Sequence, residues 1–141
     1  MPQQLTIPSR TENLREVRDF VAGLARDVGF EEDIVGMIAL AVDEACTNII
    51  KHGYRYAADK QIEIHVETSN GTFEISIVDE GKSFDPSVIH SPNMKDYLTH
   101  YRHGGLGLHL MRSLMDNVDY KTSGTRNVVR MIKRIPHRKT A

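Results

Sequence analysis

The sequence predicts an α+β fold, a two-layer α/β sandwich in which helices cover one face of a mostly antiparallel, mixed sheet. Two amphipathic helical patterns occupy the first 53 residues, and two alternating segments joined by an Asn-Gly turn follow them. Two further strand patterns lie near the C-terminus. Because helices and strands do not alternate one by one, this arrangement fits better than a doubly wound parallel sheet.

The N-terminal part predicts an edge strand and two helices. Residues 3–7 alternate weakly, and the hydroxyl of Ser9 or Thr11 is available to cap the helix that follows. Apolar residues then recur at three- and four-residue spacing up to Gly29, a residue suited to a helix C-terminus. A longer helix is expected over about 31–52. Acidic residues at its start interact favourably with the positive end of the helix dipole.

The C-terminal part predicts four strands interrupted by a long polar segment. Residues 61–68 and 72–78 alternate strictly, which is typical of a β-hairpin. Residues 80–104 show no period, and a stretch of this length inside a compact domain is usually functional or mobile. The other expected elements are a short helix at 106–115 and strands at 118–122 and 127–135.

Length and composition indicate one soluble domain. The chain has 141 residues and a formal net charge of -1, so its charge does not favour nucleic acid or a membrane surface. It contains neither a signal-peptide pattern nor about 18 consecutive apolar residues. The single cysteine, Cys46, is typical of a reducing compartment. We expect a cytoplasmic protein with one domain over 1–141, of which 136–141 form a flexible tail.

One motif whose residues could take part in catalysis or metal binding lies on the long helix. Glu44 and Asn48 are four residues apart, at the edge of the apolar stripe, so their side chains are neighbours. A carboxylate there could accept a proton from a hydroxyl, and an amide oxygen is a suitable ligand for Mg²⁺. The alternative is an ordinary pair of polar surface residues.

Two further motifs contain glycine. Asp79-Glu80-Gly81 follows a strand, where the carboxylate could accept a hydrogen bond from a base's exocyclic amine; the alternative is a polar turn. The segment 104–108 (GGLGL) precedes the short predicted helix, whose first N–H groups could bind phosphate. It matches neither a Walker A nor a Rossmann signature, and its alternative is a flexible loop that closes onto a helix.

The order and placement of these motifs resemble the GHKL (Bergerat-fold) ATPases. Glu44-x-x-x-Asn48 looks like the N box, Asp79-x-Gly81 like the first glycine box and residues 105–108 like the second. Within this superfamily the chain is most similar to the anti-sigma-factor serine/threonine kinases. The residues that carry this similarity are 43–54 (DEACTNIIKHGY), 84–86 (FDP) and 114–116 (LMD), and the resemblance extends over about residues 5–135.

The resemblance implies a histidine-kinase-like ATP-binding domain that transfers phosphate. Glu44 would be the general base that activates the attacking hydroxyl, and Asn48 would hold Mg²⁺ on the ATP phosphates. Asp79 would read the adenine amino group, and Gly81 would let the base approach the backbone. The other implied ATP-binding residues are Phe84, Gly104, Gly105, Leu106, Gly107, Leu108 and Thr125, with residues 87–103 as the ATP lid.

The sequence departs from the wider superfamily pattern in two places. Ser83 stands where many members have a second glycine, which would stiffen the turn after Asp79. The lid contains three histidines, but further ligands at useful spacing for a structural metal are not evident. Phosphate contact by Arg102 or by a lid histidine is the preferred interpretation.

The resemblance also implies a regulatory function. The expected protein is a kinase and anti-sigma factor in a partner switch that controls transcription. It would phosphorylate an anti-anti-sigma (STAS-type) antagonist and sequester a sigma factor, without direct contact with nucleic acid or membrane. Arg18 resembles a partner-contact position, and a homodimer is expected from the family alone. The alternatives are an ATP-gated binding module without phosphoryl transfer and a scaffold that binds no nucleotide.

Overall fold

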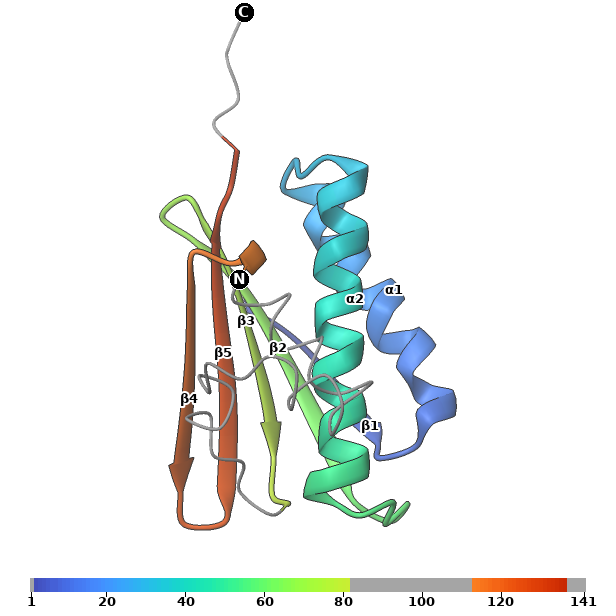
Figure 1. Cartoon of the computed structure of the whole chain (residues 1–141). Coiled ribbons are helices and arrows are strands. Elements are labelled where there is room, and N and C mark those ends of the chain that lie inside the picture. Colours follow the sequence, from blue (N-terminus) through green and yellow to red (C-terminus); the bar gives the residue numbers. More distant parts are fainter. Residues whose placement is uncertain (1, 82–112, 137–141) are drawn as a thin grey trace, which may run out of the picture.

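The computed structural model describes residues 2–81 and 113–136, and these form the predicted two-layer fold (Figure 1). In chain order its elements are β1 (Gln3–Pro8), the 3-10 turn η1 (Thr11–Asn13), α1 (Leu14–Asp27), α2 (Glu32–Asn48), the π-helical segment η2 (Ile49–Gly53), β2 (Gln61–Ser69), β3 (Thr72–Asp79), β4 (Asn117–Ser123) and β5 (Arg126–Arg134). Within this described part, no helix combines the length and the apolar character that a membrane crossing requires.

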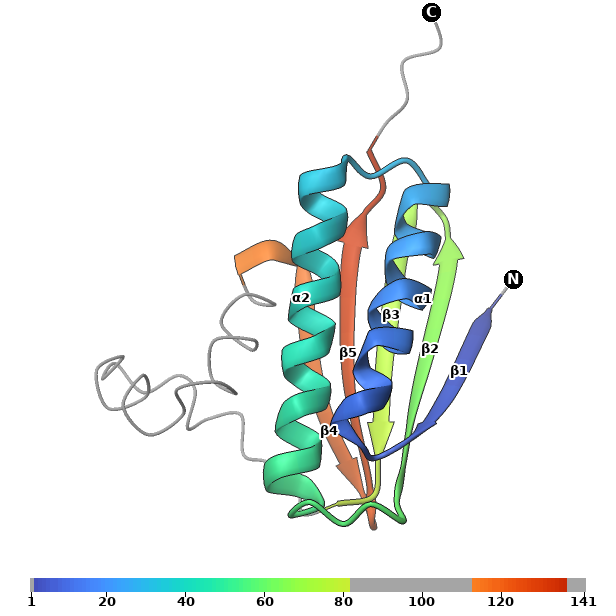
Figure 2. The ribbon, with the colours of Figure 1, turned by 90° about the vertical axis from the view of Figure 1, so that its right-hand side faces the viewer.

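The described strands form one sheet in the order β1-β2-β3-β5-β4, and both α-helices lie on the same face of it (Figure 2). All four strand pairings are antiparallel, so the mixed character expected of the sheet is absent from the described strands. β2 and β3 form the predicted hairpin. Its two turn residues, Asn70 and Gly71, both have positive φ angles (52° and 78°), as a type I′ turn requires.

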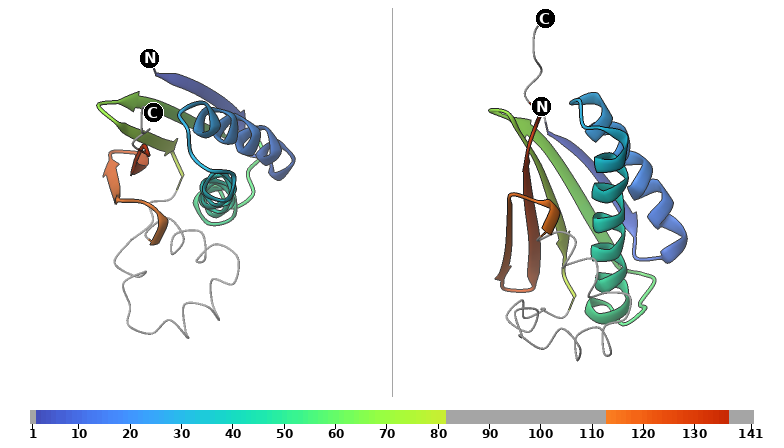
Figure 3. Two further views of the ribbon diagram at one scale, coloured as in Figure 1. Left: turned by 90° about the horizontal axis from the view of Figure 1, so that it is seen from above. Right: turned by 45° about the horizontal axis from the view of Figure 1, so that its top comes forward.

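The hydrophobic core lies between the sheet and the two helices (Figure 3). Inward positions of the strands carry aliphatic or aromatic side chains, and the positions between them are mostly polar, as the alternation predicts. The apolar stripes of α1 and α2 cover these inward side chains. The largest fully buried side chains are Ile7, Val17, Val21, Ile38, Ile50, Ile62, Ile64, Phe73, Ile75, Ile77 and Met131.

The C-terminal end of α1 is the one that the sequence predicts. Gly29 has a φ angle of 101°, and its N–H donates to the carbonyl of Arg26. The N–H of Phe30 donates to the carbonyl of Ala25. These two hydrogen bonds and the left-handed glycine form a Schellman C-cap, which turns the chain toward α2.

The predicted cap at the start of this helical region is wrong. Neither η1 nor α1 has a side-chain hydrogen bond at its N-cap. Ser9 is buried instead, and its hydroxyl donates to the carbonyl of Ala57 in the loop before β2. Its backbone N–H donates to the carbonyl of Lys60 at 2.9 Å. The local capping preference of serine is overridden because the end of β1 packs against this loop.

Candidate functional site

Two of the three predicted motifs lie at one end of the sandwich. Glu44 and Asn48 are half-buried in the last turns of α2. β3 ends at Asp79, and this end of the strand lies beside the C-terminal end of the α2–η2 helix in both side views (Figures 1 and 2). The turn between β4 and β5, which contains Thr125, is at the same end of the molecule.

The third motif falls outside the described residues. The predicted site residues that the structure does not describe are Phe84, Gly104, Gly105, Leu106, Gly107 and Leu108. The same holds for Ser83, for the expected lid at 87–103 with its histidines and Arg102, and for residues 137–141 of the expected tail. Their roles stay predictions.

Asp79 is the centre of a buried polar network. The residue is 5% exposed, and its Oδ1 accepts hydrogen bonds from the Gly81 backbone N–H at 2.8 Å and from Asn127 Nδ2 at 3.0 Å. Burial raises the pKa of Asp79 and the charge of Glu80 adds to the rise, whereas the two hydrogen bonds oppose it. Both hydrogen bonds that the described residues donate to this carboxylate go to Oδ1. Oδ2 accepts neither of these two hydrogen bonds.

Asn127 is a site residue that sequence reasoning missed. It lies opposite Asp79 on β5 and is 1% exposed. Its Nδ2 donates to Asp79 Oδ1 and, at 2.9 Å, to the carbonyl of Gly81, while its Oδ1 accepts from the Thr122 hydroxyl at 3.0 Å. A buried amide with these partners fixes the Asp79-Glu80-Gly81 segment, called here the 79–81 turn. Thr125, the predicted residue of this region, is exposed in the neighbouring turn.

The absence of a side chain at Gly81 is required by another backbone. A Cβ at Gly81 would lie 2.6 Å from the carbonyl C and O of Gly53 and 2.9 Å from its Cα. Gly53 is the last residue of η2, which continues the helix that carries Glu44 and Asn48. Glycine at position 81 therefore lets the 79–81 turn pack directly against the end of this helix. The expected approach of a base to Gly81 is a separate prediction.

Electrostatics also connect Asp79 to α2. Cys46 lies between Glu44 and Asn48 in sequence and is fully buried. Burial raises the pKa of its thiol, and the charges of Asp43 and Asp79 raise it further. Asp79 is thus close enough to α2 for its charge to act on a core residue there. A thiol with a raised pKa is a poor nucleophile, so Cys46 serves as a core residue.

Arg18, the predicted partner contact, forms a bond inside the molecule. Its Nη1 donates to Asp43 Oδ1 at 2.7 Å and joins α1 to α2 one residue before Glu44. The side chain of Arg18 is 42% exposed and that of Asp43 is 16% exposed. The guanidinium is therefore reachable from solvent, although it is already paired.

The oxygen donors at this end of α2 suit Mg²⁺ held mainly by a nucleotide. Mg²⁺ usually takes one or two protein oxygens and receives the rest of its ligands from phosphate and water. Asn48 offers an amide oxygen and Glu44 a carboxylate. Within 2–81 and 113–136, no three His, Cys, Asp or Glu residues gather as a metal site. Asn48 and Glu44 are the residues that would hold such a nucleotide-bound ion.

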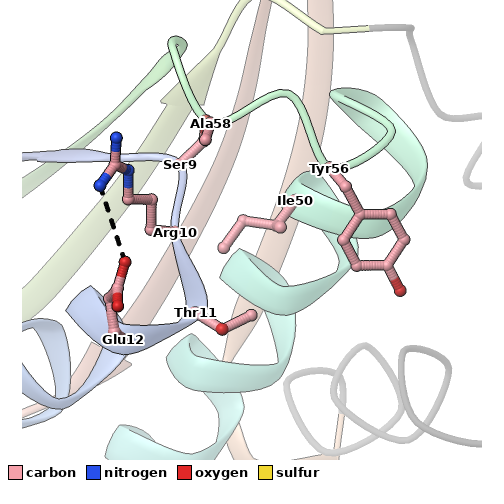
Figure 4. A pocket seen from close by; sticks show the side chains of 7 residues that line it. All are labelled: Ser9, Arg10, Thr11, Glu12, Ile50, Tyr56 and Ala58. Carbon is pink, nitrogen blue, oxygen red and sulfur yellow. Dashed lines mark ion pairs between the residues drawn. The ribbon is translucent and has the colours of Figure 1, made fainter.

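A separate hollow of about 370 Å³ lies beside η2 and the start of the α1 region (Figure 4). It is lined by Ser9, Arg10, Thr11, Glu12, Ile50, Tyr56 and Ala58. Arg10 and Glu12 form an ion pair at 3.8 Å at its edge. None of the predicted nucleotide residues lines this hollow, so it is distinct from the site at Asp79.

Asp79→Asn is expected to change how stability depends on pH. Because the folded state raises the pKa of Asp79, wild-type stability should fall as pH rises from the ordinary value of 3.8 through the raised pKa. An amide cannot titrate, so the variant should gain stability relative to wild type over this rise. Denaturant unfolding between about pH 3 and pH 8 measures the difference.

The exposed Asp59 supplies the control for this experiment. Asp59→Asn makes the same chemical change at an exposed position, so it shows the effect of the substitution without burial. If the stabilities of wild type and Asp79→Asn depend on pH in the same way, the claim that burial raises the pKa of Asp79 would be contradicted.

Known proteins share both sequence and fold with this chain. It matches the histidine kinase-like ATPase domain family over residues 7–133. It is 32% identical to serine-protein kinase RsbW of Halalkalibacterium halodurans over 122 residues. These residues cover 84% of this chain and 74% of that protein. RsbW of Bacillus cereus is also 32% identical, over 119 residues that cover 82% of this chain and 74% of that protein.

Two solved structures show the same fold. The RsbU and RsbW domains of a Mycobacterium tuberculosis protein have a TM-score of 0.68 at 18% identity; the match covers 100% of this chain but 35% of that one. The catalytic domain of histidine kinase ThkA has a TM-score of 0.56 at 16% identity. The match covers 94% of this chain and 96% of that one. Both the fold class and the family expected from the sequence are confirmed. The chain belongs to the histidine kinase-like ATPase domain family and, within it, to the RsbW group of serine-protein kinases.

Proposed function

We propose that this ATP-dependent serine/threonine protein kinase is a cytoplasmic anti-sigma factor in a partner switch. It phosphorylates an anti-anti-sigma (STAS-type) antagonist and sequesters a sigma factor while the antagonist is phosphorylated. The observation that supports this most is the packing of the buried Asp79 network against the helix that carries Glu44 and Asn48. In this proposal, the group that reads the base and the groups that handle phosphate lie at the same end of the sandwich.

Asp79 reads the base in this proposal. Its Oδ1 is held by Gly81 and Asn127, so Oδ2 has a fixed position and can accept from the exocyclic amine of adenine. A base that carries a carbonyl at that position would set oxygen against oxygen. An unpaired acceptor in a buried site is costly, so such an arrangement selects strongly for adenine.

Glu44 and Asn48 handle the phosphoryl group. The carboxylate of Glu44 accepts the proton of the antagonist's serine or threonine hydroxyl as that oxygen bonds to the γ-phosphorus. The bond from the γ-phosphorus to the bridging oxygen breaks, and ADP leaves with its electrons. Asn48 holds Mg²⁺ through its amide oxygen. When bound, Mg²⁺ neutralises charge on the phosphate oxygens.

Glu44→Gln is expected to separate ATP binding from phosphoryl transfer. The amide keeps the shape of the side chain but cannot take the proton, so transfer should slow by about 10²–10⁴-fold while ATP affinity changes little. The measurements are ATP titration calorimetry and phosphate labelling of a candidate anti-anti-sigma protein. A Glu44→Gln protein that labels the antagonist at the wild-type rate would contradict the role of Glu44.

The same variant distinguishes the alternative function. An ATP-gated binding module without transfer requires that Glu44→Gln retains full control of its partner. In that case, wild-type protein would bind ATP but label no candidate antagonist. Asp79→Asn serves as the paired variant, because it should lose ATP binding and partner control under either function.

Arg18→Ala is expected to weaken partner binding and leave ATP affinity unchanged. Loss of its partly exposed pair with Asp43 should cost no more than about 1 kcal/mol of stability. Asp43→Ala separates the two roles of Arg18, because it removes the acceptor of the pair but keeps the guanidinium for a partner. Arg15→Ala, an exposed arginine on the same helix, is the control. Equal partner affinity for wild type and Arg18→Ala, measured by calorimetry, would refute the assignment.

A further inference from the structure

The hydroxyl of Tyr54 joins three segments at the end of the sandwich that carries the site. Tyr54 directly follows η2 and is 8% exposed. Its hydroxyl donates to the carbonyl of Gln61, the first residue of β2, at 2.6 Å. The same oxygen accepts from the backbone N–H of Glu80 at 2.8 Å. Glu80 is the middle residue of the 79–81 turn, so one phenol connects the helix end, β2 and the turn that carries Asp79.

The backbone around Tyr54 is fixed by its own hydrogen bonds. Its N–H donates to the carbonyl of Ile49 at 2.7 Å, the five-residue spacing of a π-helix. Arg55 and Tyr56 follow with positive φ angles of 50° and 65°, and the N–H of Tyr56 donates to the carbonyl of Ile50 at 2.7 Å. Non-glycine residues hold this conformation only where the surrounding structure enforces it. The position of the phenol is thereby determined by the helix end.

The 79–81 turn is held from two sides. On the β5 side, the amide of Asn127 bonds to Asp79 and Gly81. On the helix side, Tyr54 bonds to Glu80, and Gly53 packs against Gly81. Removal of the Tyr54 hydroxyl would leave the Glu80 N–H without this acceptor, and the turn would be held by hydrogen bonds on one side only.

The charges near Tyr54 indicate that its hydroxyl stays protonated while it holds the turn. Burial raises the pKa of Tyr54, and the carboxylates of Asp79, Glu80 and Glu63 raise it further, whereas the hydrogen bond from the Glu80 N–H opposes the rise. A protonated phenol is required for both bonds, because it donates to Gln61 while it accepts from Glu80.

We propose that Tyr54 is a positioning residue of the nucleotide site, which rests on the function proposed above. By holding the backbone of Glu80, its hydroxyl fixes the direction of Asp79 Oδ2 and so sets the preference for a base with an exocyclic amine over one with a carbonyl. Tyr54 acts through the backbone and does not take part in transfer. Its removal therefore affects base discrimination, while the transfer step that depends on Glu44 keeps its rate.

The test compares ATP with inosine triphosphate, which has a carbonyl where adenine has its amine. Tyr54→Phe removes only the hydroxyl, and Tyr56→Phe, a mostly exposed tyrosine two residues on, is the matched control. Calorimetry should show that Tyr54→Phe weakens ATP binding by about 5–10-fold, as expected for one lost hydrogen bond, and changes inosine triphosphate binding by less than about twofold. The transfer rate at saturating ATP should stay within about twofold of wild type, and Tyr56→Phe should match wild type throughout.

The outcomes separate this inference from the proposed function. A Tyr54→Phe protein with the wild-type ratio of ATP to inosine triphosphate affinity would overturn the positioning role alone. Wild-type protein that binds neither nucleotide would overturn the proposed function and, with it, the role of Tyr54. If Tyr54→Phe does not fold, amide exchange in wild type decides: slow exchange of the Glu80 N–H without nucleotide supports the inference, and exchange as fast as in an open loop refutes it.

Discussion

The close approach of two backbones, Gly81 against Gly53, determines the geometry of the candidate site. It brings the turn after β3 onto the end of the helix that carries Glu44 and Asn48, and a single Cβ at position 81 would prevent it. Asn127 and Tyr54 then hold the turn from opposite sides. Main-chain packing thus sets the distance between the part of the site predicted to read the base and the part predicted to handle phosphate. Such packing is stiffer than contact between long side chains.

Asp79 shows how the fold accommodates a carboxylate at the edge of its core. It occupies an inward position of β3, two residues after the buried Ile77, where the alternation would place an apolar side chain. Burial raises its pKa, and the hydrogen bonds from Gly81 and Asn127 offset part of that cost. A protein that needed only stability would gain by an apolar residue there. Groups that disagree with their local pattern are common at functional sites, because function rather than folding retains them.

Local patterns in the sequence predicted the fold well because most of its elements follow local rules. The strand alternation, the Asn-Gly turn at 70–71 and the glycine at the end of α1 each depend on a few neighbouring residues. The features that could not be predicted depend on contacts across the fold. Ser9 bonds to the loop before β2 instead of capping a helix, and the end of the long helix widens into a π-turn as it packs against the 79–81 turn. In the sequence, Asn127 stands out only as a polar residue at an inward strand position. The pairing of β3 with β5 is what shows that it bonds to Asp79.

The most direct test of this account is ATP binding by Gly81→Ala. The added methyl group would lie against the backbone of Gly53, which cannot move aside as a flexible side chain would, so the 79–81 turn must shift. We expect a loss of about 1–3 kcal/mol in stability, typical of overpacking, in a protein that keeps its circular dichroism spectrum. Its ATP affinity, measured by titration calorimetry with Mg²⁺, should fall at least about tenfold, equivalent to about 1.4 kcal/mol. A folded Gly81→Ala protein that binds ATP as tightly as wild type would contradict the claim that this backbone contact builds the site.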